Sequence, residues 1–338
     1  MTDIITVDNL TETYASGTKA VDGISFRVPE GQFFGFLGPN GAGKSTTIKV
    51  LSTLLRKTSG SVTIGGHDLD QDPDGIRRII GVQSQETVVD GDLTGRKNLL
   101  FQGHLQRMQG ATLQRRVEEL LDLMELQGAA DRKAKQYSGG MKRRLSLAAS
   151  LVHRPRLVFL DEPTTGLDPQ SRAKVWGYLS KLNKEEGTTV FLTTQYLEEA
   201  DKLCRQLSII DHGKIVASGS PTDLKEQIGG ETIILTLGPE AEAPARDALE
   251  GRLRALPGVG RVVELDRGVV VYARQASRLV PEIVTLSQGV GVPLESINLA
   301  APTLDDVFLQ KTGSRIRQGD LVTGAPPASV SGVRGGNY

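Results

Sequence analysis

Apolar residues in the first 228 positions gather in short runs, which are interrupted by one long helical stretch. The runs lie at residues 4–8, 24–28, 33–37, 157–160 and 207–210. Runs of this length are typical of buried strands. Helical periodicity dominates from Asp92 to about Met124. Because strand and helix alternate on both sides of that stretch, the pattern predicts an α/β core with a partly parallel sheet and an inserted helical region.

A second, smaller unit begins near Gly229-Gly230. Its elements are expected at residues 232–237 (strand), 241–256 (helix), 261–265 and 269–273 (hairpin), 276–287 (helix) and 292–298 (strand). This β-α-β-β-α-β order is that of ferredoxin-like domains. We therefore expect an α+β accessory domain over residues 229–313. Residues 314–338 contain five glycines, two prolines and few large apolar groups, so we expect a disordered tail there.

Composition narrows the classes of function. The 338 residues include 40 basic and 40 acidic side chains, so no overall field favours nucleic acid and no such partner is expected. The single cysteine, Cys204, rules out an intrachain disulfide and suits a reducing compartment. No run approaches the roughly eighteen apolar residues of a membrane helix, and the first residues show no secretory signal. We expect a soluble chain whose membrane role comes from a partner.

The run Gly38-Pro39-Asn40-Gly41-Ala42-Gly43-Lys44-Ser45 fits the phosphate-loop pattern G-x-x-x-x-G-K-[ST]. It follows the apolar run at 33–37 and precedes a helix expected from Thr46 to Leu55. In that setting glycines let backbone N–H groups converge on phosphate oxygens, Lys44 supplies a positive charge, and the Ser45 hydroxyl can bind Mg²⁺. A glycine-rich structural turn is the alternative, but it does not explain the Lys-Ser pair. The sequence predicts a nucleoside triphosphate site.

Two adjacent acids, Asp161 and Glu162, end the apolar run at 157–160. Because consecutive side chains at a strand end point in different directions, the two carboxylates can serve different roles. We expect Asp161 near Mg²⁺ and Glu162 near the attacking water. Adjacent acids after a strand are usually a solvated turn, and the preceding phosphate loop is what favours the catalytic interpretation.

A third group, Ser138-Gly139-Gly140, precedes a helix expected over about Met141–Leu151. Two glycines before a helix N-terminus form an anion-binding nest, to which the Ser138 hydroxyl adds a donor. One γ-phosphate does not need two nests from one subunit, so the second is explained if it closes on nucleotide held by another subunit. A glycine-rich helix cap is the structural alternative.

The phosphate loop, Ser138-Gly139-Gly140, Asp161-Glu162 and Gly166-Leu167-Asp168 together resemble an ATP-binding cassette (ABC) protein over about residues 4–228. The resemblance implies a P-loop NTPase fold of ABC type with an inserted helical subdomain. It also implies a head-to-tail homodimer with two ATP molecules, each bound with Mg²⁺ between the phosphate loop of one subunit and the Ser138 nest of the other. The ATP-binding residues implied are Tyr14, Gly38, Pro39, Asn40, Gly41, Ala42, Gly43, Lys44, Ser45, Thr46, Gln85, Ser138, Gly139, Gly140 and Asp168.

The resemblance also assigns roles to individual residues. Tyr14 is expected to stack on adenine, with a surface tyrosine as the alternative, and Asp168 is expected to couple the two sites. Gln85 is expected to contact Mg²⁺ and water. Gln83 competes for this role, but the spacing of the two glutamines from residues 92–94 favours Gln85. The expected catalytic residues are Lys44, Glu162 and Gln195, and the expected metal ligands are Ser45, Gln85 and Asp161.

One departure narrows the subfamily. Most cassettes place a histidine after an apolar strand, where this chain has Gln195 within Thr-Thr-Gln-Tyr. Glutamine can hydrogen-bond a γ-phosphate but carries no proton near neutral pH, and capping the next helix is its alternative role. Tyr137 and Met141 replace the commoner leucine and glutamine around Ser-Gly-Gly, and residues 303–309 read Thr-Leu-Asp-Asp-Val-Phe-Leu. These features resemble drug-exporter ATPases of the daunorubicin/doxorubicin-resistance type.

The resemblance implies an ATPase at the cytoplasmic face of the cell membrane that powers a separate permease for a hydrophobic, anthracycline-like drug. The alternative is a soluble regulatory cassette ATPase of translation or DNA repair. Such proteins usually carry two cassettes or a long coiled coil, whereas one phosphate loop is present here and 52 residues lie between Gln85 and Ser138. A metabolic kinase that shares only the phosphate loop does not explain Ser138-Gly139-Gly140.

Overall fold

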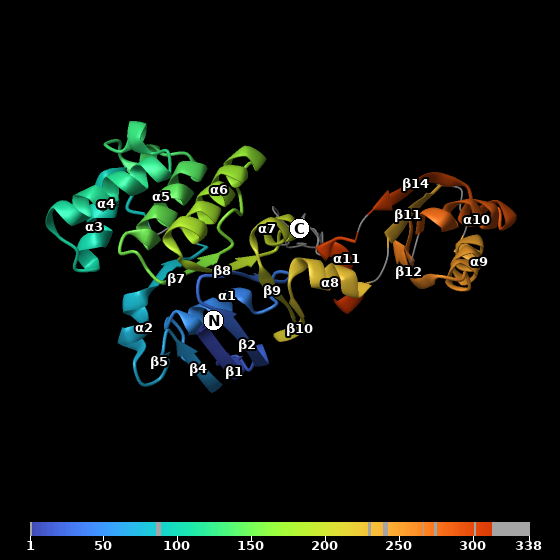
Figure 1. Ribbon diagram of the computed structural model, residues 1–338, viewed down its shortest axis with the longest axis horizontal. Helices are drawn as coiled ribbons and strands as arrows, with labels where there is room; N and C mark the ends of the chain where they lie inside the picture. Colours follow the sequence, from blue (N-terminus) through green and yellow to red (C-terminus); the bar gives the residue numbers. More distant parts are fainter. Residues whose placement is uncertain are drawn as a thin grey trace, which may run out of the picture.

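The structure is a computed structural model that describes residues 2–85, 89–228, 231–238, 243–265, 267–273, 276–300 and 302–312. A large N-terminal lobe and a smaller C-terminal lobe lie side by side along the long axis, joined by helices α8 (Pro221–Ile228) and α11 (Leu304–Thr312) (Figure 1). The expected tail at 314–338 and the expected boundary at Gly229-Gly230 lie outside the described residues.

A six-stranded sheet forms the centre of the large lobe, in the order β10-β9-β3-β8-β7-β6. Its strands are β3 (Phe33–Leu37), β6 (Ile80–Gln83), β7 (Leu157–Asp161), β8 (Thr189–Thr194), β9 (Gln206–Asp211) and β10 (Lys214–Gly219). All neighbours are parallel except β9 and β10, which confirms the partly parallel sheet. Every residue of β3, β7 and β8 is buried, as expected for strands covered on both faces.

The register of this sheet determines where the predicted site residues emerge. Leu37 pairs with Thr194 and Asp161 pairs with Thr193, so β3, β7 and β8 end at one edge. The phosphate loop, Glu162 and Gln195 follow these ends directly in the sequence. Parallel strands therefore deliver three predicted motifs to the same edge of the sheet.

A second, antiparallel sheet packs against the first, in the order β2-β1-β4-β5. Its strands are β1 (Asp3–Thr13), β2 (Lys19–Pro29), β4 (Ser59–Ile64) and β5 (His67–Asp68). Phe191 on β8 lies 5.4–5.6 Å, between ring centroids, from Phe34, Phe36 and Phe159, and Phe26 of β2 completes this aromatic cluster. Helices α1 (Lys44–Leu51) and α2 (Pro73–Ile79) belong to this half of the lobe.

The inserted helical region is confirmed, and it lies at one end of the large lobe (Figure 1). Its main helices are α3 (Gly95–Leu105), α4 (Gly110–Leu123) and α5 (Gly139–Leu151), with single 3₁₀ turns at Gln127–Ala129 and Ala134–Gln136. The predicted stretch from Asp92 to Met124 is therefore two helices, which separate where Arg107 has a positive φ of 60°. Helices α6 (Pro169–Glu186) and α7 (Leu197–Leu203) pack against each other and against the central sheet.

The C-terminal lobe has the predicted element order. Its sheet has the order β12-β13-β11-β14, and all neighbours are antiparallel, as in a ferredoxin-like split β-α-β fold. The strands are β11 (Glu231–Leu237), β12 (Val259–Leu265), β13 (Gly268–Ala273) and β14 (Leu294–Ala300), and the helices are α9 (Ala243–Arg254) and α10 (Ala276–Gly289). The boundaries differ from the expected ones by about two residues, because strand ends depend on pairing partners.

Helix α11 was not predicted as a helix, and it packs against the large lobe. Phe308 and Val307 share a buried cluster with Leu197 of α7 and Leu224 of α8. On its other side, the Tyr272 hydroxyl of β13 donates to Asp306 Oδ1 at 3.0 Å. The chain therefore returns from the C-terminal lobe to the large lobe. Across the described residues, no helix combines the length and apolar character that a membrane crossing requires.

Candidate nucleotide-binding site

A cleft of about 720 Å³ opens at the edge of the sheet where β3, β6 and β7 end. Predicted site residues form much of its wall: Tyr14, Asn40, Gly41, Gly43, Lys44, Ser45, Thr46, Gln85 and Glu162. Five unpredicted neighbours also line it: Thr18, Lys19, Ala20, His212 and Gly213. The structure thus gathers the phosphate loop, the aromatic residue, the glutamine and the carboxylate at one cavity.

The phosphate loop owes its shape to two glycines that no other residue could replace without movement. A Cβ on Gly38 would collide with the Ile210 carbonyl, and one on Gly43 with the Ala20 carbonyl. Gly43 also has a φ of 109°, which only glycine adopts readily. Helix α1 begins at Lys44, two residues earlier than predicted, and no side chain caps it. Its first N–H groups therefore make a suitable site for an anion.

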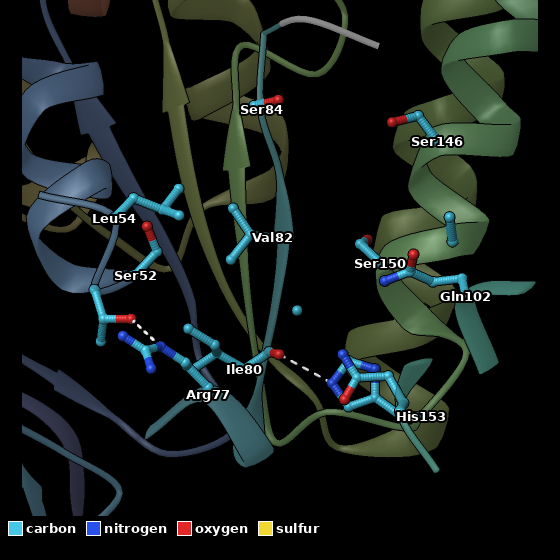
Figure 2. Close-up of a pocket in the computed structure, with 14 residues that line it drawn as sticks. Ser52, Leu54, Arg77, Ile80, Val82, Ser84, Gln102, Ser146, Ser150 and His153 are labelled. Atoms are coloured by element: carbon cyan, nitrogen blue, oxygen red, sulfur yellow. Dashed lines mark hydrogen bonds between the residues drawn. The ribbon is translucent and has the colours of Figure 1, made fainter. Parts of the chain in front are cut away.

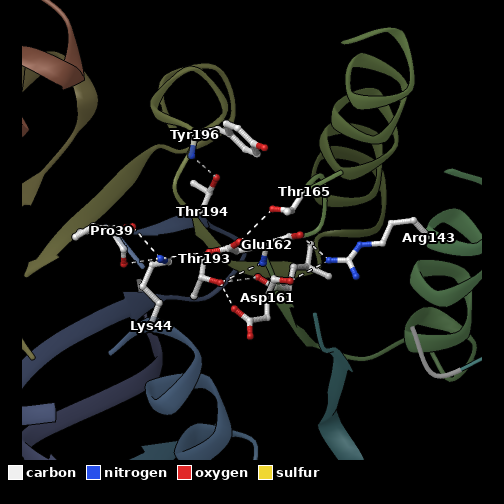
Figure 3. A network of polar contacts seen from close by, with 11 residues as sticks. Pro39, Lys44, Arg143, Asp161, Glu162, Thr165, Thr193, Thr194 and Tyr196 are labelled. Atoms are coloured by element: carbon white, nitrogen blue, oxygen red, sulfur yellow. Dashed lines mark hydrogen bonds and ion pairs between the residues drawn. The ribbon is translucent and has the colours of Figure 1, made fainter. Parts of the chain in front are cut away.

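Lys44 and Glu162 form a buried ion pair beneath the loop (Figure 3). The Lys44 ammonium lies 3.3 Å from Glu162 Oε1 and donates to the carbonyls of Gly38 at 2.8 Å and Pro39 at 3.0 Å. Burial lowers the pKa of Lys44, and the neighbouring Glu162 carboxylate opposes that shift. The Lys44 ammonium is thus held between the carbonyls of the phosphate loop and the Glu162 carboxylate.

Glu162 has an unusual backbone conformation for a non-glycine residue, with a φ of +48°. Its N–H donates to the Thr193 carbonyl at 3.1 Å and to Thr193 Oγ1 at 3.2 Å, and its Oε2 accepts from the Thr165 hydroxyl at 3.1 Å. The Thr193 hydroxyl also donates to Asp161 Oδ1 at 2.6 Å. Glu162 lines the cleft and Asp161 does not, so the two carboxylates diverge.

The two candidate glutamines lie in different environments. Gln83 is buried and its Nε2 donates to the Arg143 carbonyl at 3.5 Å, whereas Gln85 is exposed and lines the cleft. Tyr14 also lines the cleft and is 38% exposed, and its hydroxyl lies 2.9 Å from Thr46 Oγ1. A large aromatic face is therefore available at the start of α1.

Gln195 follows the last residue of β8, whose carbonyl accepts from the Gly38 N–H at 3.4 Å. It is half-buried and is not among the residues that line the cleft. The residue before α7 is Tyr196, and no side chain caps that helix. The alternative role for Gln195 as a helix cap is therefore wrong.

Ser138, Gly139, Gly140 and Asp168 are not among the residues that line this cleft. Ser138 and Gly139 are exposed at the start of α5, and the Ser138 hydroxyl accepts from the Met141 N–H at 3.3 Å, so it does cap the helix. Asp168 is exposed at the start of α6, where hydrogen bonds from the Ser171 hydroxyl and N–H lower its pKa. The predicted residues therefore fall into two separate groups on one chain.

Two buried charged residues near the site were given no role from sequence. Arg143 of α5 is 6% exposed, and Glu199 of α7 is fully buried. Glu199 Oε1 accepts from the Thr164 hydroxyl at 3.0 Å and from Trp176 Nε1 at 2.8 Å, while burial raises its pKa. Arg143 lies shortly after Ser138-Gly139-Gly140 and Glu199 shortly after Thr-Thr-Gln-Tyr, but the sequence pattern assigns neither a role, since their burial arises only when α5, α6 and α7 pack onto the sheet.

Oxygen ligands suitable for Mg²⁺ are present at the cleft. The Ser45 hydroxyl and the Gln85 amide line it, and Asp161 lies at the adjacent strand end. Such hard donors fit Mg²⁺, which usually keeps several waters and binds substrate phosphates. In the described part of the chain no group of three or more His, Cys, Asp or Glu side chains gathers.

Comparison with known proteins agrees with this geometry. A family model described as "ABC transporter" matches residues 21–165, and one described as "ATP-binding protein DrrA1-3-like, C-terminal domain" matches residues 219–312. The chain is 43% identical over 318 residues to the daunorubicin/doxorubicin resistance ATP-binding protein DrrA of Streptomyces peucetius, covering 92% of this chain and 93% of that one. It is 36% identical over 317 residues to the linearmycin resistance ATP-binding protein LnrL of Bacillus subtilis, covering 93% and 100%.

Solved structures resemble the large lobe. One is a dimeric ATP-binding cassette in a post-hydrolysis state bound to ADP and Pi, with a TM-score of 0.60 and 28% identity over 64% of this chain and 98% of that one. Another is a dimeric bacterial ABC transporter cassette, with a TM-score of 0.60 and 29% identity over the same shares. The fold and the relatives agree with the arrangement of loop, acid and cleft, and this chain belongs to the ATP-hydrolysing, ATP-binding proteins of ABC transporters, in their DrrA-like group.

Proposed function

We propose that the chain is the ATPase subunit of an exporter that moves a hydrophobic, anthracycline-like drug through a separate permease at the cytoplasmic face of the membrane. The observation that carries this proposal is the cleft, in which the phosphate loop, Lys44, Glu162 and Gln85 meet. Relatives named for resistance to daunorubicin, doxorubicin and linearmycin support the drug class. None of the relatives compared above is a translation or DNA-repair protein, so nothing favours the regulatory alternative.

The residues at the cleft suggest how ATP is held and cleaved. The N–H groups of the loop and the start of α1 bind the phosphates, and the exposed ring of Tyr14 stacks on adenine. Phosphate oxygens are strong anionic acceptors, so we infer that they attract the Lys44 ammonium away from Glu162. The freed carboxylate then accepts a proton from the attacking water. Mg²⁺, which Ser45, Gln85 and Asp161 would hold, offsets negative charge on the phosphates when bound.

The second group of predicted residues is explained by a partner subunit. ATP-binding cassettes of this family dimerise and pair with membrane permeases. We propose a head-to-tail homodimer in which the exposed Ser138 and Gly139 of one chain close on the cleft of the other. Asp168 lies at the start of α6, and Gly140 packs near Leu167 and Ser171, so the same surface would couple the two sites.

A groove of about 350 Å³ between the sheet and the inserted helices is our candidate for the permease contact (Figure 2). Leu54, after α1, is 69% exposed on one side, and Ser146 and His153 face it from α5 and its end. His153 Nε2 lies 2.9 Å from the Ile80 carbonyl at the floor. A permease segment in this groove would contact both halves of the lobe and could therefore sense their relative position.

Reconstitution with the permease tests this function. We expect an anthracycline to stimulate ATP hydrolysis by the chain and its permease in vesicles, because the drug site and the ATP site would be linked through the groove.

Leu54→Asp should reduce co-purification of the permease about tenfold or more, since an aspartate desolvated at an apolar contact is strongly unfavourable. Leu299→Asp, at a residue 50% exposed in the C-terminal lobe, is the matched control. Drug-insensitive hydrolysis in the complete complex would contradict the proposal.

Gln195 offers a test of the phosphate-sensing role. Gln195→Ala should lower kcat by about tenfold, the value of one lost hydrogen bond, while ATP affinity falls by about threefold or less because many phosphate contacts remain. The exposed Gln127→Ala serves as the control. Gln195→His should add a pH dependence centred at about 6.5, because histidine titrates there and glutamine carries no proton near neutral pH. Wild-type turnover in Gln195→Ala would remove this residue from the mechanism.

A further inference from the structure

Arg143 uses its whole guanidinium on backbone carbonyls, and Figure 3 shows the side chain beside Asp161 and Glu162. A guanidinium has five N–H donors, and the structure provides an acceptor for each. The acceptors are the carbonyls of Pro163 (2.8 Å from Nε), Ser84 and Gln85 (3.2 and 2.9 Å from Nη1), and Asp161 and Glu162 (3.0 and 2.5 Å from Nη2). The side chain thus joins the two segments that supply Gln85 and Glu162 to the cleft.

The environment of Arg143 differs from that of an ordinary buried arginine in this chain. Arg116 of α4 is equally buried, but it pairs with the carboxylates of Glu186 and Glu119 and with the Leu151 carbonyl, away from the cleft. Burial lowers the pKa of Arg143, and the nearby carboxylates of Asp161 and Glu162 oppose the shift. Arg116 is therefore a matched comparison for charge and burial without contact to the site.

Two further contacts make the arrangement rigid. Glu162 has its N–H bound by Thr193 and its carbonyl bound by Arg143, so its left-handed backbone is held from both sides. Gln83 Nε2 donates to the carbonyl of Arg143 itself at 3.5 Å. The same helix, α5, begins with Ser138 as its cap, five residues before Arg143. A shift of α5 would be transmitted to Glu162 through these bonds.

We propose that Arg143 is a positioning residue that fixes Glu162 and Gln85 relative to α5. Through α5 it links the carboxylate of one nucleotide site to the Ser138 nest that serves the other. The first part needs only the cleft, whereas the link between sites rests on the proposed head-to-tail dimer. The guanidinium of Arg143 can hold both segments because its planar fork directs N–H donors at each of them. A side chain without that fork cannot donate to both segments at once.

Arg143→Lys tests the positioning role, since an ammonium keeps the charge but offers three donors without the planar fork. We expect kcat for ATP to fall about 10- to 100-fold, as for a misplaced catalytic group, with KM changed by about threefold or less. Arg116→Lys should keep wild-type kcat per folded molecule. A melting curve on each preparation restricts the comparison to folded protein, and Arg143→Gln repeats the test if the lysine variant does not fold. Equal kcat values for the two lysine variants would overturn the proposal.

The link between sites is tested in cross-linked heterodimers with one site inactivated by Lys44→Ala. Placing Arg143→Lys in the Lys44→Ala chain, which supplies only the Ser138 nest to the surviving site, should lower the turnover of that site. In the Arg143→Lys homodimer the Hill coefficient for ATP should fall toward one. A preserved Hill coefficient would refute the link but leave the positioning role. Failure of the proposed function itself would show separately, as drug-insensitive hydrolysis in the complete complex with the permease.

Discussion

Glu162→Gln should abolish nearly all turnover, lowering kcat about 100- to 10,000-fold, the usual contribution of a general base. The amide has nearly the same size, so it fits the buried position, but it cannot accept a proton from water. It also lacks the charge that pairs with Lys44, although the loop carbonyls of Gly38 and Pro39 still hold the ammonium. ATP binding should therefore survive, with Kd changed by about threefold or less.

The same variant should accumulate as a closed, ATP-bound dimer if hydrolysis is the step that opens it. Size-exclusion chromatography with ATP measures this, and single-turnover kinetics measures the chemical step. Glu198→Gln is the control, because it makes the same carboxylate-to-amide change four residues before Lys202 on the exposed face of α7. Near-normal steady-state hydrolysis in Glu162→Gln would exclude Glu162 as the base.

Cross-linked heterodimers that combine Lys44→Ala in one chain with Ser138→Arg in the other should retain one intact site. The structure separates the two residues: Lys44 lines the cleft, and Ser138 is exposed at the start of α5 outside it. If each nest serves the opposite chain, both changes fall in the same site, and the second site is untouched. We expect about half of wild-type ATP occupancy and, where the sites turn over independently, about half of its hydrolysis.

The control is the heterodimer in which one chain carries both changes and its partner is wild type. Under the head-to-tail scheme the damage is then divided between both sites, so both should lose function. Occupancy is measured with a fluorescent ATP analogue on the cross-linked protein. Two equally impaired sites in the first heterodimer, together with one intact site in the control, would place nest and loop in the same subunit's site.

Local sequence determined the main chemical groups of this protein. Glycines at positions 38 and 43 are required by backbone geometry that can be inferred from the motif, and the apolar run before Asp161 specifies a buried strand that ends in two acids. The order of elements in the C-terminal lobe was likewise readable, because periodicity of two and of 3.6 residues is a local property. These features depend on neighbours along the chain.

Contacts between residues that are far apart in the sequence could not be predicted in the same way. Gln83 and Gln85 lie in different environments because β6 pairs with β7 and buries Gln83, whereas Gln85 follows the strand and lines the cleft. The separation of Ser138 from the cleft, the five bonds of Arg143, the burial of Glu199 and the return of α11 arise from contacts between elements far apart in sequence. Burial and hydrogen-bond partners of a side chain are set by which surfaces pack together. The sequence therefore determined which groups this protein carries, and only the tertiary structure decided which of them share a site.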